Sequence, residues 1–155
     1  MAYKKTSLCQ LDDLSCFGCC GYDYSTPREV REGIEKNTLE YQNCKTHKEF
    51  ANRPRAGQRR WCGVCRNVVF IRDKKGILRA GCPLHPKLNR GKEMRKKQDC
   101  LINYLCKTAV SFDGWNKKKQ ERFLKFLRTK KLDIINYSLG MDSDKWLKEF
   151  EDLEF

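Results

Sequence analysis

The chain has 155 residues, enough for one ordinary domain or two very small ones. Hydrophobic residues make up 39% and charged residues 34%, so we expect only a modest core. No run of eighteen apolar residues occurs, and the first residues lack the apolar segment of a secretory signal, which predicts a cytoplasmic protein without a membrane span. In a reducing cytoplasm, ten cysteines indicate metal binding rather than disulfides.

The positive charge is concentrated in the middle of the chain. Residues 1–50 hold 7 Lys or Arg and 8 Asp or Glu, residues 51–110 hold 16 and 3, and residues 111–155 hold 10 and 9. The formal net charges of the three segments are therefore −1, +13 and +1. This distribution predicts that the middle segment faces an anionic partner, and nucleic-acid phosphates suit it.

The N-terminal residues predict a short helix followed by a metal-binding turn. Leu8, Leu11 and Leu14 are spaced as if on one side of a helix within residues 1–15. Cys16 and Cys19 form a Cys-x2-Cys knuckle whose glycines allow the backbone amides to fold toward sulfur. Cys20 is surplus, and three interpretations remain open: it replaces Cys19 as a ligand, it is a packed thiol, or it indicates an iron–sulfur cluster.

A helix is predicted from Pro27 to about Asn43. Thr26 has the position of an N-cap, Pro27 that of the first helical residue, and Glu29 completes a capping box. Cys44-Lys-Thr-His47 follows at once and provides a second pair of metal-ligating side chains.

Residues 52–61 have the composition of an exposed loop, with four arginines and a terminal Trp61. Guanidinium groups offer planar donor pairs that fit phosphate. Trp61 has two interpretations, because it can stack on an unpaired base or pack beneath the knuckle that follows.

The stretch from Trp61 to His85 predicts a zinc module. Cys62-x2-Cys65 is followed after sixteen residues by Cys82-x2-His85, and three thiolates with one imidazole leave no coordination position open, as in structural zinc sites. The β-branched and aromatic residues of 66–72 favour a strand, residues 73–76 a turn, and residues 77–80 a returning strand. The resulting hairpin would bring the two ligand pairs together.

Two zinc ions are expected, and the four ligand pairs can close in two ways. The sequential pairing, which we favour, joins Cys16, Cys19, Cys44 and His47 in one site and Cys62, Cys65, Cys82 and His85 in the other. A cross-braced pairing joins the first pair with the third and the second with the fourth. The sequential form needs no long-range partner, because a hairpin closes its second site.

The remaining residues predict helices. We expect one from about Lys87 to Thr108, in which Cys100 and Cys106 are core thiols, and its many cations oppose the dipole at its N-terminus. Another begins near Asn116, and an apolar run ends at Gly140, which favours a helix stop. The last helix follows residues 142–144 and buries Trp146, Leu147, Phe150 and Leu153.

Residues 61–108 resemble treble-clef and zinc-ribbon modules, because a knuckle, a hairpin, Cys-x2-His and a helix follow in that order. The resemblance is one of architecture and implies a small metal-stapled scaffold that binds nucleic acid or protein. It identifies no particular family across the chain, and architecture alone does not assign a function.

The fold class predicted is a small, zinc-stabilised α+β protein whose knuckle, β-hairpin and Cys-x2-His module pack with several α-helices, with an all-helical C-terminal part. Its organisation would be an N-terminal zinc-binding helical segment (1–50), a basic zinc module (51–110) and a helical support (111–155), forming one compact unit.

The predicted function is binding of RNA or DNA through phosphate contacts. Two alternatives remain open: an adaptor for an acidic protein partner within a larger complex, and an iron–sulfur or redox protein. No nucleotide-binding or hydrolase motif occurs and both histidines are assigned to metal, so catalysis is not expected. The predicted nucleic-acid contacts are Arg53, Arg55, Arg59, Arg60, Trp61, Arg66, Arg72, Lys74, Lys75, Arg79, Lys87, Arg90, Lys92, Arg95 and Lys96.

Overall fold

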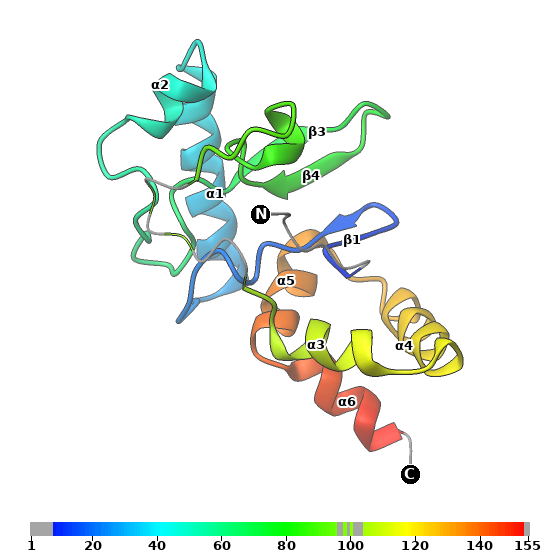
Figure 1. Ribbon diagram of the computed structural model, residues 1–155. Helices are drawn as coiled ribbons and strands as arrows, with labels where there is room; N and C mark the ends of the chain where they lie inside the picture. Colours follow the sequence, from blue (N-terminus) through cyan, green and yellow to red (C-terminus); the bar gives the residue numbers. More distant parts are fainter. Residues whose placement is uncertain (1–7, 96–97, 99, 101–103, 154–155) are drawn as a thin grey trace.

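The computed structural model describes residues 8–95, 98, 100 and 104–153. Helices predominate, and two small antiparallel sheets of two strands each accompany them (Figure 1). In chain order the elements are β1 (Gln10–Leu11), β2 (Leu14–Ser15), α1 (Pro27–Gln42), α2 (His47–Ala51), β3 (Val69–Arg72), β4 (Leu78–Gly81), the 3-10 turn η1 (Pro86–Leu88), α3 (Lys107–Gly114), α4 (Lys117–Thr129), α5 (Ile134–Asp142) and α6 (Lys145–Leu153). The protein is therefore a small α+β fold, as predicted.

The N-terminal helix prediction was wrong, because residues 10–15 form the β1–β2 hairpin. Leu11 pairs with Leu14 across a turn made by the two aspartates between them, and Asp12 has a φ of 54°. The leucine side chains are buried all the same. A spacing of three residues fits a tight hairpin here as well as a helix. The pattern therefore predicted the buried leucines correctly but assigned the wrong secondary structure.

Helix α1 confirms the sequence prediction at both ends. The Thr26 side chain accepts from the Glu29 backbone N–H at 3.2 Å, Pro27 is the first helical residue, and Asn43 is the C-cap. Val30 and Ile34 on one side of the helix are fully buried. That side covers the β3–β4 hairpin, where the Phe70 N–H donates to Thr38 Oγ1 at 3.0 Å.

The predicted central hairpin is confirmed. Strands β3 and β4 pair from Val69↔Gly81 to Arg72↔Leu78, and the turn between them is closed by a bond from the Gly76 N–H to the Asp73 carbonyl at 3.0 Å. Gly76 has a φ of 80°, a conformation that glycine adopts without strain.

The long helix expected over residues 87–108 was wrong. Among its described residues, only η1 and the first residues of α3 are helical. Arg90 and Gly91 have φ values of 54° and 82°, which a right-handed helix cannot contain. Of the cations that would have opposed the helix dipole, Arg90, Lys92 and Arg95 therefore lie outside a helix. Cys100 is exposed, so its assignment as a core thiol was also wrong.

The C-terminal part is all-helical, as predicted, and α3 to α6 lie together (yellow-green to red in Figure 1). Asn116 caps α4 as expected, but Gly140 does not end a helix, because α5 continues to Asp142. Gly140 instead provides room for the Trp146 indole. In α6, Trp146, Leu147 and Phe150 are buried, whereas Leu153 is 70% exposed, contrary to the prediction.

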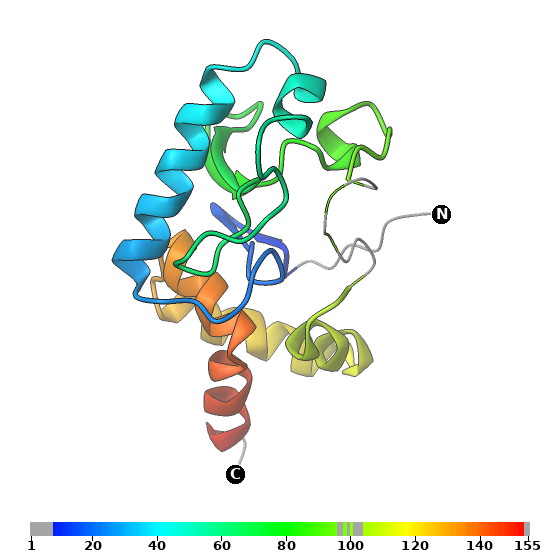
Figure 2. The same ribbon diagram turned by 90° about the vertical axis from the view of Figure 1, so that its left-hand side faces the viewer.

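Three apolar clusters form the core of the part of the chain that the structure describes. One joins the β1–β2 hairpin to the C-terminal helices and contains Phe112, Phe123 and Phe150. The second contains Phe17, Val30, Cys62, Ala80 and Ile135, and so draws on all three segments of the sequence. The third, smaller cluster surrounds Phe50 near α2. Helix α1 runs along one side of the molecule and links the second cluster to the third (Figure 2).

Candidate nucleic-acid interface and cysteine sites

Two of the predicted contact arginines face inward and anchor the 52–61 loop to α1. Arg53 Nε lies 2.9 Å from Glu40 Oε1, and Arg60 bonds the other carboxylate oxygen. Their side chains are only 8% and 11% exposed. Arg53 also donates to Asn67 Oδ1 at 2.8 Å and to the Arg66 carbonyl. These bonds hold the loop in one shape and leave little of either guanidinium for a ligand.

Asn37 completes this anchor from the buried side of α1. Its Oδ1 accepts from Arg60 Nε at 2.6 Å, and its Nδ2 donates to the carbonyls of Cys65 and Val68 at 2.9 and 2.8 Å. Asn37 has no exposed surface. One amide therefore connects the helix, the loop and the second knuckle.

Trp61 lies at the tip of a turn and faces solvent. The Gly63 N–H closes this turn on the Arg60 carbonyl at 2.9 Å, and 67% of Trp61 is exposed. Gly63 has a φ of 106°, and a Cβ there would lie 2.7 Å from the Tyr22 carbonyl oxygen. Because most of the Trp61 side chain is exposed, the structure excludes the interpretation in which Trp61 packs beneath the knuckle.

The exposed Tyr22 and the half-buried Arg59 form a pair beside this turn. The Tyr22 N–H donates to the Gly63 carbonyl at 3.1 Å, and 62% of Tyr22 is exposed. The Arg59 guanidinium lies 4.4 Å from the centre of the Tyr22 ring and donates to the Tyr22 carbonyl at 2.8 Å. Tyr22, Arg59, Trp61 and the exposed Arg55 are called the arginine–aromatic face below. Tyr22 was absent from the predicted contacts because it lies far from the basic segment in sequence.

Arg66 adds a partly buried cation next to this face. The backbone N–H of Arg66 donates to the Gln58 carbonyl at 2.8 Å. The side-chain Nε is buried and has no hydrogen-bond partner among the described residues. Burial, followed by the guanidinium groups of Arg60 and Arg55, lowers the pKa of Arg66. Arginine nevertheless stays protonated in proteins, so the Arg66 guanidinium keeps its positive charge. An anion bound beside it would stabilise that charge.

The other predicted cations differ in their surroundings. Arg79 is bound to Asp73 at 3.2 Å and to the Leu14 carbonyl at 2.8 Å, and Arg95 is bound to Glu93 at 2.7 Å, so both have structural partners. Lys96 lies outside the described residues. The exposed predicted cations are Arg72, Lys74, Lys75, Lys87, Arg90 and Lys92.

The structure does not bring the first sequential ligand set together. Cys16 and Cys19 line a cavity beside α5, and Tyr24, just before α1, donates its hydroxyl proton to the Gly18 carbonyl at 3.1 Å. Cys44 follows the opposite end of α1 and packs near Phe50. Helix α1, which has 16 residues, lies between the first knuckle and Cys44. At 1.5 Å per residue its length is roughly 24 Å.

The histidine of that set has hydrogen-bond partners at both ring nitrogens. His47 Nε2 lies 2.9 Å from the Tyr41 hydroxyl, and its Nδ1 lies 2.5 Å from Asn89 Oδ1. Coordination of a metal would require one of these contacts to break.

The second sequential set is also only partly assembled. Cys62 is fully buried among Val30, Ile34 and Val64, so its sulfur packs as a core atom. The Asn67 N–H donates to Cys65 Sγ at 3.4 Å, as in a knuckle. Burial raises the pKa of Cys82 to about 12. His85 Nδ1 accepts the Lys87 N–H at 3.1 Å.

The third and fourth ligand pairs are neighbours through Cys65 and Cys82, since, besides burial, negative charge at Cys65 raises the pKa of Cys82, and other contacts join the pairs in the crossed order. The first and third pairs meet where Gly21 bridges Val64 and the Cys65 N–H donates to the Cys20 carbonyl at 2.8 Å. The second and fourth meet at Asn89, whose Nδ2 donates to the His85 carbonyl at 2.9 Å. Among the described residues, no three Cys, His, Asp or Glu side chains lie in a group that could hold a metal ion.

Three of the cysteines outside the predicted sets lie near the knuckle cysteines. Cys9 and Cys106 line the same cavity as Cys16 and Cys19. A hydrogen bond between the adjacent thiols lowers the pKa of Cys19 and raises that of Cys20. Sequence reasoning missed Cys9 and Cys106 because neither belongs to a Cys-x2-Cys or Cys-x2-His pair, and only the β1–β2 register would have placed Cys9.

Comparison with protein-family models, with curated proteins and with solved structures finds no match. None of the helices in the described part of the chain is long and apolar enough to cross a membrane.

Proposed function

We propose that this protein binds nucleic acid, and that unpaired bases stack on the arginine–aromatic face. The observation that carries the proposal is the exposure of Trp61 and Tyr22, with the Arg59 guanidinium lying over the Tyr22 ring and Arg55 exposed in the same loop as Trp61. Base stacking on an aromatic side chain contributes about 1–3 kcal/mol per base, and arginine adds phosphate contacts. We also propose zinc as the metal that its cysteines bind.

The division of the loop arginines supports this proposal. Arg53 and Arg60 fix the loop through Glu40, and this bonding directs Trp61 outward at the end of a rigid turn. A pre-shaped surface loses less conformational entropy on binding than a mobile loop would. The partly buried Arg66, beside Arg55, offers a place for a phosphate oxygen.

An acidic protein partner would use the same charges but has less need of two exposed rings. Binding to single-stranded oligonucleotides of mixed sequence, measured by fluorescence anisotropy over a range of salt concentrations, separates the two. For nucleic acid, log K should fall steeply with log salt, by about 0.7 per phosphate contact in single strands. A flat salt dependence with weak binding would contradict the proposal.

Trp61→Ala should weaken oligonucleotide binding about 5- to 150-fold, the equivalent of about 1–3 kcal/mol, and leave the salt slope unchanged. Arg55→Gln should reduce the slope by about 0.7. The matched controls are Leu39→Ala, an exposed apolar residue on α1, and Arg128→Gln, an exposed arginine that bonds Asp12 on the opposite part of the molecule. Equal affinities for Trp61→Ala and Leu39→Ala would remove the tryptophan from the interface.

A further inference from the structure

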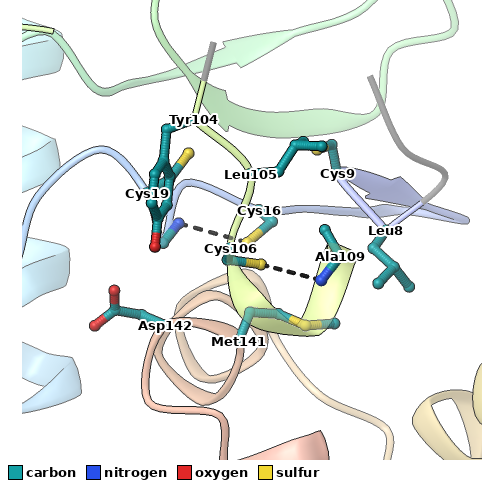
Figure 3. Close-up of a pocket in the computed structure, with 11 residues that line it drawn as sticks. Leu8, Cys9, Cys16, Cys19, Tyr104, Leu105, Cys106, Ala109, Met141 and Asp142 are labelled. Atoms are coloured by element: carbon teal, nitrogen blue, oxygen red, sulfur yellow. Dashed lines mark hydrogen bonds between the residues drawn. The ribbon is translucent and has the colours of Figure 1, made fainter. Parts of the chain in front are cut away.

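Four thiols from three parts of the chain converge on one small cavity. Cys9, Cys16, Cys19 and Cys106 are among its lining residues, and their side chains surround a common space beside Met141 (Figure 3). The cavity has a volume of about 40 Å³. About 10–15 Å³ is enough to hold one water molecule, so a single ion has room.

The β1–β2 register explains why Cys9 and Cys16 lie together. Gln10 pairs with Ser15 and Leu11 with Leu14, and the next position outward places Cys9 opposite Cys16. The Cys16 N–H donates to the Cys9 carbonyl at 2.9 Å, which continues the ladder. Directly opposed residues have Cβ atoms about 4.5–5.5 Å apart, so the hairpin holds two thiols on one face.

Cys19 and Cys106 approach the same space from other elements. Cys19 ends the Cys-x2-Cys turn that begins at Cys16. Cys106 is the N-cap of α3 and accepts the Ala109 N–H on its sulfur at 3.4 Å. The segment before α3 and the first knuckle are thereby brought side by side (Figure 3).

Backbone amides already point at two of the sulfurs. In the knuckle, the Gly18 N–H donates to Cys16 Sγ at 3.4 Å. At the start of α3, the Ala109 N–H donates to Cys106 Sγ. Hydrogen bonds to sulfur are stronger when the sulfur is a thiolate. The positive end of the α3 dipole also favours negative charge at Cys106.

We propose that Cys9, Cys16, Cys19 and Cys106 form a tetrahedral four-thiolate site for structural zinc. Four sulfur ligands leave no coordination position open. Binding releases four protons, and the site then carries a net charge of about −2, which the amide donors partly offset. As placed, the sulfurs do not form a group close enough to hold an ion, so the four side chains must rotate inward on binding.

This ligand set replaces Cys44 and His47, the sequential partners of Cys16 and Cys19, with Cys9 and Cys106. It depends on the fold of the cavity and not on the arginine–aromatic face. Zinc content and oligonucleotide binding are separate measurements, so failure of one proposal is distinguishable from failure of the other.

The first test compares zinc content in two variants of the full chain. Protein purified under reducing conditions and loaded with zinc should lose one zinc per chain in Cys106→Ser, as measured by elemental analysis after gel filtration. Cys44→Ser, the matched control, should keep all of its zinc. Full zinc content in Cys106→Ser, or loss of one equivalent in Cys44→Ser, would overturn the proposed ligand set.

A second test needs no substitution and so does not depend on variants that fold. The unaltered protein is treated with iodoacetamide with and without zinc, and alkylation of each cysteine is followed by peptide mass spectrometry. Zinc should slow alkylation of Cys9, Cys16, Cys19 and Cys106 together and leave that of Cys44 unchanged. Equal rates at Cys9 and Cys106 with and without zinc, or a Cys9–Cys16 disulfide in zinc-treated reduced protein, would contradict the site.

Discussion

Asn37→Leu should lower the free energy of unfolding by about 2 to 6 kcal/mol. Each buried polar group left without a partner costs about 1–3 kcal/mol, and the substitution removes the Asn37 donor from the Val68 carbonyl, whereas the Cys65 carbonyl keeps the Val68 N–H. It also removes the acceptor of Arg60 Nε. A domain of this size has only about 5–15 kcal/mol in total, so the variant is expected to be close to unfolding.

Urea unfolding followed by circular dichroism measures this effect through the shift in midpoint. Asn43→Leu is the control, because Asn43 is an exposed residue at the end of the same helix. We expect the control to change stability by no more than about 0.5 kcal/mol. If both variants had the same midpoint, the bonds of Asn37 would not be holding α1 to the second knuckle.

Gly140→Ala should destabilise the protein by about 1–3 kcal/mol or more, although alanine is the better helix former. A Cβ at this position of α5 would overlap the Trp146 indole. Relief of the overlap would displace the indole, whose Nε1 donates to the Tyr137 carbonyl at 3.1 Å. The steric cost thus reverses the sign expected from helix propensity.

Gly114→Ala is the matched control, because Gly114 is also helical and a Cβ there meets no atom within 4 Å. It should stabilise the protein by about 0.4–1 kcal/mol. In a thermal melt, each kcal/mol corresponds to about 2–4 °C at this chain length. An increase in melting temperature for both variants would show that Trp146 does not pack on Gly140.

Local signals in the sequence predicted the elements that local chemistry determines. The capping box at Thr26 located the start of α1, and the turn at residues 73–76 located the central hairpin. Both depend on hydrogen bonds between residues close in sequence. Two other local features were missed because their patterns have two interpretations: leucines three residues apart fit a tight hairpin as well as a helix, and a glycine after an apolar run can make room for a neighbouring ring instead of ending a helix.

The mistaken helix at residues 87–108 has a specific physical cause. Its cations would oppose the helix dipole, and among the residues of this stretch that the structure describes, few are helical. The inward arginines could not be predicted either, since Glu40 is remote in sequence and no pattern distinguishes Arg53 and Arg60 from Arg55 and Arg59. Burial decides which arginines remain available to a ligand, and it depends on the whole fold.

The hydrogen bonds that tie the first residues to α5 have a consequence for biosynthesis. The Phe17 N–H donates to Ser138 Oγ, and the Tyr137 hydroxyl donates to the Leu8 carbonyl, across separations of 121 and 129 residues. Such non-local contacts slow folding. We expect a ribosome-bound nascent chain to stay sensitive to protease until α5 has emerged, and resistance in chains arrested near residue 110 would show that the earlier part folds alone.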